Sequence, residues 1–110
     1  MHRFLSASVL LQALLVTFVA AQSTGKLSGR VLDATTGEPL PGANVVIVGT
    51  QTGTAADVDG NYFILGVPAG TYDVAASFVG YSTQTVTGVD VNAGYTKELN
   101  FSLQPGQELA

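Results

Sequence analysis

Asp57 and Asp59 stand just before Gly60, and this spacing is the one in the chain that most resembles a metal-binding loop. Carboxylates beside a glycine are typical of calcium loops. If Gly60 takes the sixth position of an EF-hand loop, however, the first and last positions are Ala55 and Gly66, which are not ligands. The pattern therefore favours a hairpin turn in which aspartates accept hydrogen bonds from nearby backbone amides. A weak calcium site is the alternative.

The same two carboxylates could be compared with a glycosidase pair, which needs roughly 5 to 9.5 Å of separation across a cleft. A chain of 110 residues leaves little room for such a cleft. Beyond residue 21 the sequence contains no histidine, cysteine, methionine or tryptophan. Serine-histidine or cysteine-histidine catalysis, zinc ligation and haem ligation therefore lack their usual residues. We predict no catalytic residues, no cofactor and no metal, and a function that rests on binding.

The candidate binding residues lie in predicted turns. Thr50, Thr52 and Thr54 fall in a stretch rich in threonine and glycine, and Tyr81 follows Gly80. Tyrosines can stack on sugars or proteins when they are exposed. Tyr81 and Tyr95 adjoin turn glycines and are expected at the surface. Tyr62 and Tyr72 are expected in the core. The four binding-loop candidates are thus Thr50, Thr52, Thr54 and Tyr81.

The N-terminus has the composition of an export signal. Met1, His2 and Arg3 precede a nearly unbroken apolar run over residues 4–19. The run is shorter than the roughly 20 apolar residues of a membrane-spanning helix, so cleavage is favoured over anchoring. We expect a signal peptide at residues 1–21, a single domain at 22–103 and no membrane span in the mature chain.

The mature chain is acidic and lacks cysteine. Three lysines and arginines remain beyond residue 21, against eight aspartates and glutamates. The basic residues are scattered, which disfavours a nucleic-acid partner, because phosphate binding needs clustered cations. The acidic balance also disfavours anionic lipid surfaces. Without disulfides, the fold must depend on an apolar core.

The hydrophobic pattern predicts strands throughout the mature chain. Apolar residues recur with a period of two in short segments that end at glycine, proline or aspartate. Seven strands are expected, at residues 26–32, 44–48, a short segment ending near 57, and 62–67, 72–78, 84–91 and 97–103. The fold class is therefore an all-β, seven-stranded antiparallel β-sandwich. Residues 104–110 contain Pro-Gly and no periodicity, and read as a linker-like tail.

One predicted strand has an edge that is open to pairing. Residues 84–89 of this strand contain no charged side chain. Natural edge strands are commonly protected by charges, so this one could accept a partner strand by β-augmentation. Under this hypothesis, proline at Thr85 abolishes partner capture and leaves the fold intact.

The ordered motifs resemble a known family. Residues 29–33 read Gly-Arg-Val-Leu-Asp, residues 36–45 contain Gly-Glu-Pro-Leu-Pro-Gly, residues 53–62 end in Asp-Val-Asp-Gly-Asn-Tyr, and Gly-Tyr follows at 80–81. Together they resemble a carboxypeptidase regulatory-like domain. The resemblance implies a transthyretin-like sandwich fold. It implies no peptidase activity, because the zinc ligands of those enzymes belong to a separate catalytic domain.

The resemblance also implies a place in the cell. Such domains occur as periplasmic N-terminal extensions of TonB-dependent outer-membrane receptors, directly after the signal peptide. We therefore expect an exported accessory or docking module, in the periplasm or associated with the outer membrane. Its protein partner would be the receptor's plug or barrel, or another envelope component. The alternative is a free-standing secreted or surface module that binds a polysaccharide or a protein.

Overall fold

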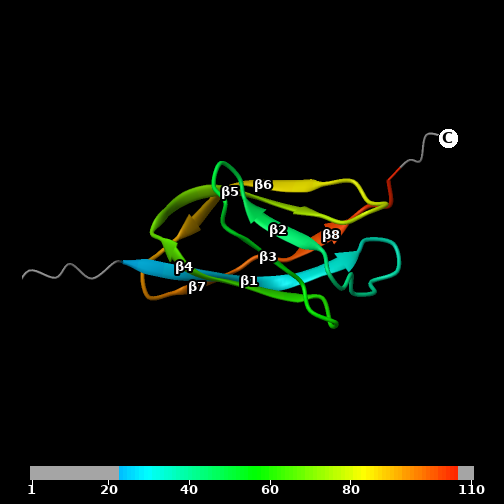
Figure 1. Cartoon of the computed structure of the whole chain (residues 1–110), viewed down its shortest axis with the longest axis horizontal. Coiled ribbons are helices and arrows are strands. Elements are labelled where there is room, and N and C mark those ends of the chain that lie inside the picture. The colour runs from blue at the N-terminus through cyan, green and yellow to red at the C-terminus, as the bar shows by residue number, and fades with distance from the viewer. Residues whose placement is uncertain (1–22, 107–110) are drawn as a thin grey trace, which may run out of the picture.

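The chain folds as a two-layered β-sandwich in a computed structural model that describes residues 23–106. The expected signal peptide, residues 1–21, lies outside the described residues, as do residues 107–110. Eight strands follow one another along the described chain (Figure 1): β1 (Thr24–Asp33), β2 (Asn44–Ile47), β3 (Gly53–Ala55), β4 (Asn61–Pro68), β5 (Gly70–Ser77), β6 (Gln84–Val91), β7 (Thr96–Glu98) and β8 (Phe101–Leu103).

The strands form two sheets. Sheet I contains β4, β1, β7 and β8, with β1 between β4 on one side and β7 and β8 on the other. Its strands β4, β1 and β7 lie low in the view of Figure 1. Sheet II has the order β3-β2-β5-β6, so β3 and β6 are its edges. Every pairing in sheet II is antiparallel, and so is β1 with β4. In contrast, β7 and β8 run parallel to β1.

The predicted β-sandwich is confirmed, but the last predicted strand differs from expectation. Residues 97–103 form two short strands rather than one, and both run parallel to their neighbour. The break falls at Leu99 and Asn100. There the side-chain Oδ1 of Asn100, rather than a main-chain carbonyl, accepts a hydrogen bond of 2.9 Å from the Arg30 amide. Apolar residues continue to alternate through the break, so the sequence pattern could not predict the break.

The core lies between the sheets and is almost entirely apolar. Tyr62 and Phe101 pack at its centre with ring centroids 6.1 Å apart, and the Tyr62 hydroxyl donates a hydrogen bond to the Leu99 carbonyl oxygen. Burial raises the pKa of Tyr62 above its ordinary value. The buried apolar side chains are Leu27, Val31, Leu40, Ala43, Val45, Ile47, Ala56, Tyr62, Ile64, Val67, Val74, Ala76, Val89, Val91, Phe101 and Leu103.

The predicted alternation in β5 is confirmed, because Val74 and Ala76 are buried while Asp73 is exposed. Tyr72 lies at the margin of the core, where its hydroxyl donates to the Pro68 carbonyl oxygen over 2.6 Å. On β2 the continuous apolar run is buried on one face only. Its neighbour strands cover both edges, but Val46 remains 40% exposed on the outer face.

The two ends of the described chain lie at opposite ends of the sandwich (Figure 1). The start of β1 shares one end with the turns at residues 68–70 and 92–94. The other end carries the 34–43 loop, the turn after β5 and the C-terminal residues, where Gly106 donates to the Gly80 carbonyl and Gln104 accepts from the Ser82 amide, each over 2.8 Å. Among residues 23–106, no helix has the length and apolar character needed to cross a bilayer.

Candidate functional site

The aspartate turn binds its own backbone. Asp57 Oδ1 accepts hydrogen bonds from the amides of Asp59 and Asn61, at 2.9 and 3.0 Å, and Gly60 has a φ of 81°. The predicted aspartate–amide bonding is therefore confirmed. The hairpin is not, because the flanking strands β3 and β4 pair with β2 and β1 in different sheets. Within residues 23–106, no three histidine, cysteine or acidic residues gather as metal ligands would.

The threonine turn joins β2 to β3. Thr50 and Thr52 are exposed there, whereas Thr54 is half-buried within β3. The Thr50 hydroxyl donates to the Ile47 carbonyl over 2.8 Å and accepts from the Thr52 amide over 3.0 Å. Thr50 therefore stabilises its own turn, and residues 48–53 are all exposed.

Tyr81 has a different environment from the one predicted. The side chain is half-buried, packs against Phe78 with centroids 5.8 Å apart, and donates its hydroxyl proton to Asp33 Oδ2 over 2.5 Å. Tyr81 also lies far from the threonine turn. Strands β2 and β5 are antiparallel, and Asn44 at the start of β2 pairs with Ser77 at the end of β5. The threonine turn follows the end of β2 and Tyr81 follows the end of β5, so they lie at opposite ends of the sheet (Figure 1). The four predicted binding residues do not form one site. The other tyrosine expected at the surface, Tyr95, is 71% exposed.

Asp33 is a buried carboxylate that links the two sheets. It ends β1, is 8% exposed, and accepts through Oδ1 from the Thr35 hydroxyl (2.6 Å), the Thr35 amide (2.7 Å) and the Thr36 amide (3.0 Å). Its Oδ2 accepts from Tyr81, which follows β5 in the opposite sheet. The Thr35 hydroxyl, followed by Tyr81, holds the pKa of Asp33 well below its usual range. The same contact raises the pKa of Tyr81, with burial and the Glu38 charge adding to it.

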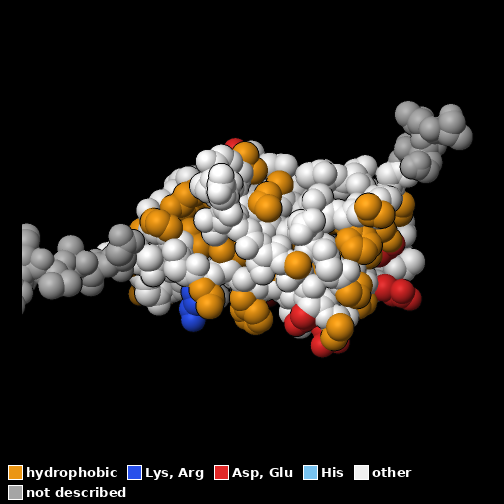
Figure 2. Space-filling view, viewed as in Figure 1, with side chains coloured by type: hydrophobic (Ala, Val, Ile, Leu, Met, Phe, Trp, Pro, Cys, Tyr) orange, Lys and Arg blue, Asp and Glu red, His pale blue; other side chains and the backbone are white. Residues whose placement is uncertain are grey.

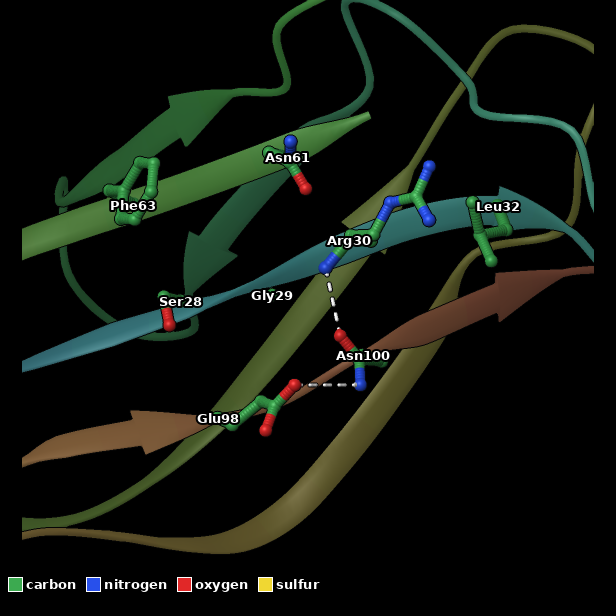
Figure 3. Close-up of a pocket in the computed structure, with 8 residues that line it drawn as sticks. All are labelled: Ser28, Gly29, Arg30, Leu32, Asn61, Phe63, Glu98 and Asn100. Atoms are coloured by element: carbon green, nitrogen blue, oxygen red, sulfur yellow. Dashed lines mark hydrogen bonds between the residues drawn. The ribbon is translucent and has the colours of Figure 1, made fainter. Parts of the chain in front are cut away.

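A shallow hollow of about 440 Å³ lies on the outer face of sheet I, where β4, β1 and the β7–β8 break meet (Figure 3). The pattern of β4 places Tyr62 and Ile64 in the core and leaves Phe63 and Leu65 on the outer face, 61% and 65% exposed. Apolar side chains accordingly stand at the surface along this layer (Figure 2). The residues that line the hollow are Ser28, Gly29, Arg30, Leu32, Asn61, Phe63, Glu98 and Asn100.

Polar side chains frame the hollow on two sides. Asn100 is held by its bond to the Arg30 amide, and its Nδ2 faces Glu98 Oε2 in a long contact of 3.5 Å (Figure 3). The Arg30 guanidinium donates to the Asp59 carbonyl over 3.1 Å. The sequence alone did not predict this hollow. The available signal was the run Tyr-Phe-Ile-Leu at residues 62–65, which supplies apolar side chains to both faces of one strand.

The family of the chain follows from its motifs and fold together. Residues 26–104, from the third residue of β1 to just past β8, match the model of the carboxypeptidase regulatory-like domain. The chain belongs to this family. Relatives include carboxypeptidase D of Anas platyrhynchos, which is 37% identical over 91 residues. They also include the TonB-dependent receptor SusC of Bacteroides thetaiotaomicron, which is 50% identical over 54 residues.

The carboxypeptidase regulatory-like chain is much shorter than these relatives. The matches cover 83% and 49% of the chain, but only 6% of carboxypeptidase D and 5% of SusC. Among solved structures, a chain of a type II cohesin–X-dockerin complex from Acetivibrio cellulolyticus superposes with a TM-score of 0.63 and 30% identity. That superposition covers 74% of this chain and 58% of the other. The family match and the structural superposition therefore agree.

Proposed function

We propose that the chain is a non-catalytic docking module and forms the N-terminal part of a TonB-dependent outer-membrane receptor. The observation that carries the proposal is the 50% identity to SusC over 54 residues. The carboxypeptidase D relatives share the same domain, but the family is regulatory-like rather than catalytic. The module would lie in the periplasm after removal of residues 1–21 and act by contact with the receptor's plug or barrel, or with another envelope component.

The form of the domain suits a place at the start of a longer protein. Its first and last described residues lie at opposite ends of the sandwich, so it can be joined in line to a following segment (Figure 1). The backbones of Gly106 and Gln104 are hydrogen-bonded to the turn after β5, which holds the last described residues against the sandwich. The partner in this proposal is a protein, and no transported substrate is assigned to the domain.

The proposal is tested by the size and compartment of the native protein. Cells that produce it are fractionated and probed with an antibody raised against residues 22–103. We expect an outer-membrane band far larger than the 11.3 kDa of this chain. A band at the size of the mature chain, in the periplasm or the medium, would instead support a free-standing secreted module that binds a polysaccharide or a protein, and the receptor assignment would fail.

A second prediction concerns how the module captures its partner. Among the strands of residues 23–106, β6 pairs with β5 alone and is an edge of sheet II, where a partner strand could be added. Amides along an antiparallel edge strand point alternately to the neighbouring strand and to solvent. Of Thr85→Pro and Val86→Pro, one variant therefore removes a backbone hydrogen bond to β5, while the other removes a backbone donor that faces outward.

The informative proline variant is the one that keeps the wild-type urea midpoint. We expect it to lose capture of the receptor's plug and barrel in a pull-down, since β-augmentation needs the outward-facing backbone donor. The control is Val58→Ala in the turn between β3 and β4, where the side chain is 77% exposed, and it should leave capture unchanged. Undiminished capture by the folded proline variant would rule out β6 as the docking edge.

A further inference from the structure

We propose that the hollow on the outer face of sheet I binds a ring of a neutral carbohydrate, with Phe63 as the stacking surface and the surrounding polar side chains as hydrogen-bond partners. The proposal concerns a face distinct from the β6 edge, and it holds whether or not the domain belongs to a receptor. It rests on the composition, the charges and the preorganisation of the hollow.

The apolar contribution comes from Phe63. This side chain is 61% exposed and stands on β4 directly across from Ser28 of β1, which is too small to cover it. Leu32, which is half-buried, lines the hollow farther along β1 (Figure 3). An aromatic ring next to small polar neighbours offers a flat apolar surface. The carbon-bound hydrogens on one face of a sugar ring can pack against such a surface.

The polar contribution combines both charges with amides. Arg30 brings a cation and Glu98 an anion to the same hollow, and Asn61 and Asn100 add amide groups. An amide can donate and accept hydrogen bonds, a guanidinium only donates and a carboxylate only accepts. Hydroxyl groups also donate and accept, so a neutral polyol can satisfy all four side chains. A charged ligand would meet like charge from Arg30 or Glu98, and an apolar one would displace water from these exposed groups without offering them hydrogen bonds.

Two of the polar side chains are already held in place. Asn100 is fixed by its 2.9 Å bond to the Arg30 amide (Figure 3). The Arg30 guanidinium donates to the Asp59 carbonyl. Preorganised groups lose less conformational entropy when a ligand binds. The hollow is nevertheless shallow, so it would contact one side of a sugar ring rather than enclose it. Micromolar to millimolar affinity is therefore expected, in the range of a weak, exposed site.

The direct test is a titration of the full chain, labelled with nitrogen-15, followed by NMR. The probes are neutral hexasaccharides of glucose, mannose, galactose and xylose at up to millimolar concentration. We expect at least one probe to cause saturable shifts of the Asn61 and Asn100 side-chain amides and of the backbone near Phe63. The dissociation constant should not change with ionic strength, because the ligand is neutral. No saturable shift with any probe, or a strong salt dependence, would overturn the proposal.

Variants on β4 identify the binding surface. Phe63→Ala is expected to weaken binding about tenfold, which is the loss of one exposed stacking contact. Phe63→Tyr keeps an aromatic ring and should bind within about twofold of wild type. Leu65→Ala is the matched control, since Leu65 is equally exposed on the same strand but does not line the hollow. Equal loss in Phe63→Ala and Leu65→Ala would point to an extended polypeptide along β4 and would refute a carbohydrate site.

Discussion

Gly29→Ala is expected to destabilise the domain by about 3 kcal/mol, a large part of the stability of a small domain. A Cβ at position 29 would lie 2.0 Å from the Leu99 carbonyl oxygen and 2.7 Å from the Leu99 carbonyl carbon. Both are backbone atoms, so the clash cannot be relieved by rotating a side chain. The break between β7 and β8 would have to move away from β1, with loss of the bond from the Arg30 amide to Asn100.

The measurement is the urea midpoint at constant m-value, which separates a change in stability from a change in the unfolded state. Gly70→Ala is the matched control. At Gly70 the atoms nearest to an added Cβ belong to the Tyr72 side chain, with the hydroxyl oxygen at 3.4 Å, and φ lies outside the left-handed region. Its midpoint should stay the same or rise slightly, because alanine restricts the unfolded chain. If Gly29→Ala and Gly70→Ala have the same urea midpoint, the close approach of Leu99 to β1 does not contribute to stability.

The second large effect is expected at Asp33, through the dependence of stability on pH. Its pKa is lowered by folding, so its carboxylate stabilises the folded state above its unfolded pKa of about 3.9. That stabilisation is lost as the pH falls below about 4 toward the folded pKa. We expect the urea midpoint of the wild type to decrease as the pH is lowered from 5 to 2, which is about the range in which a carboxyl group titrates. Asp33→Asn should start lower at neutral pH and fall less over the same range.

Tyr81→Phe isolates the contact between the sheets. It removes one of the donors to Asp33, so the folded pKa of Asp33 should rise toward its ordinary value and the acid transition should move to higher pH. In a double-mutant cycle, Asp33→Asn should cost less stability in the Tyr81→Phe background than in the wild type. Strictly additive losses, with the acid transition unmoved in Tyr81→Phe, would contradict a coupled pair.

Local patterns accounted for most of the strands and for the sandwich. The alternation of Tyr72, Val74 and Ala76 placed one face of β5 in the core, and the glycine and proline positions located the turns. The ordered motifs over residues 29–81 also identified the family. These properties depend on side-chain direction along a single strand and on turn residues, which neighbours in the sequence determine.

Contacts between distant segments were decided only by the tertiary structure. Tyr81 follows a turn glycine, which suggested exposure, yet it bonds to Asp33, 48 positions earlier. The residues around the hollow likewise come from β1, β4 and the β7–β8 break. The parallel direction of β7 and β8 and the interruption at Asn100 have the same origin. Strand periodicity defines which faces are apolar, but it carries no information about which strand becomes the neighbour or in which direction it runs, because those depend on how the whole chain packs.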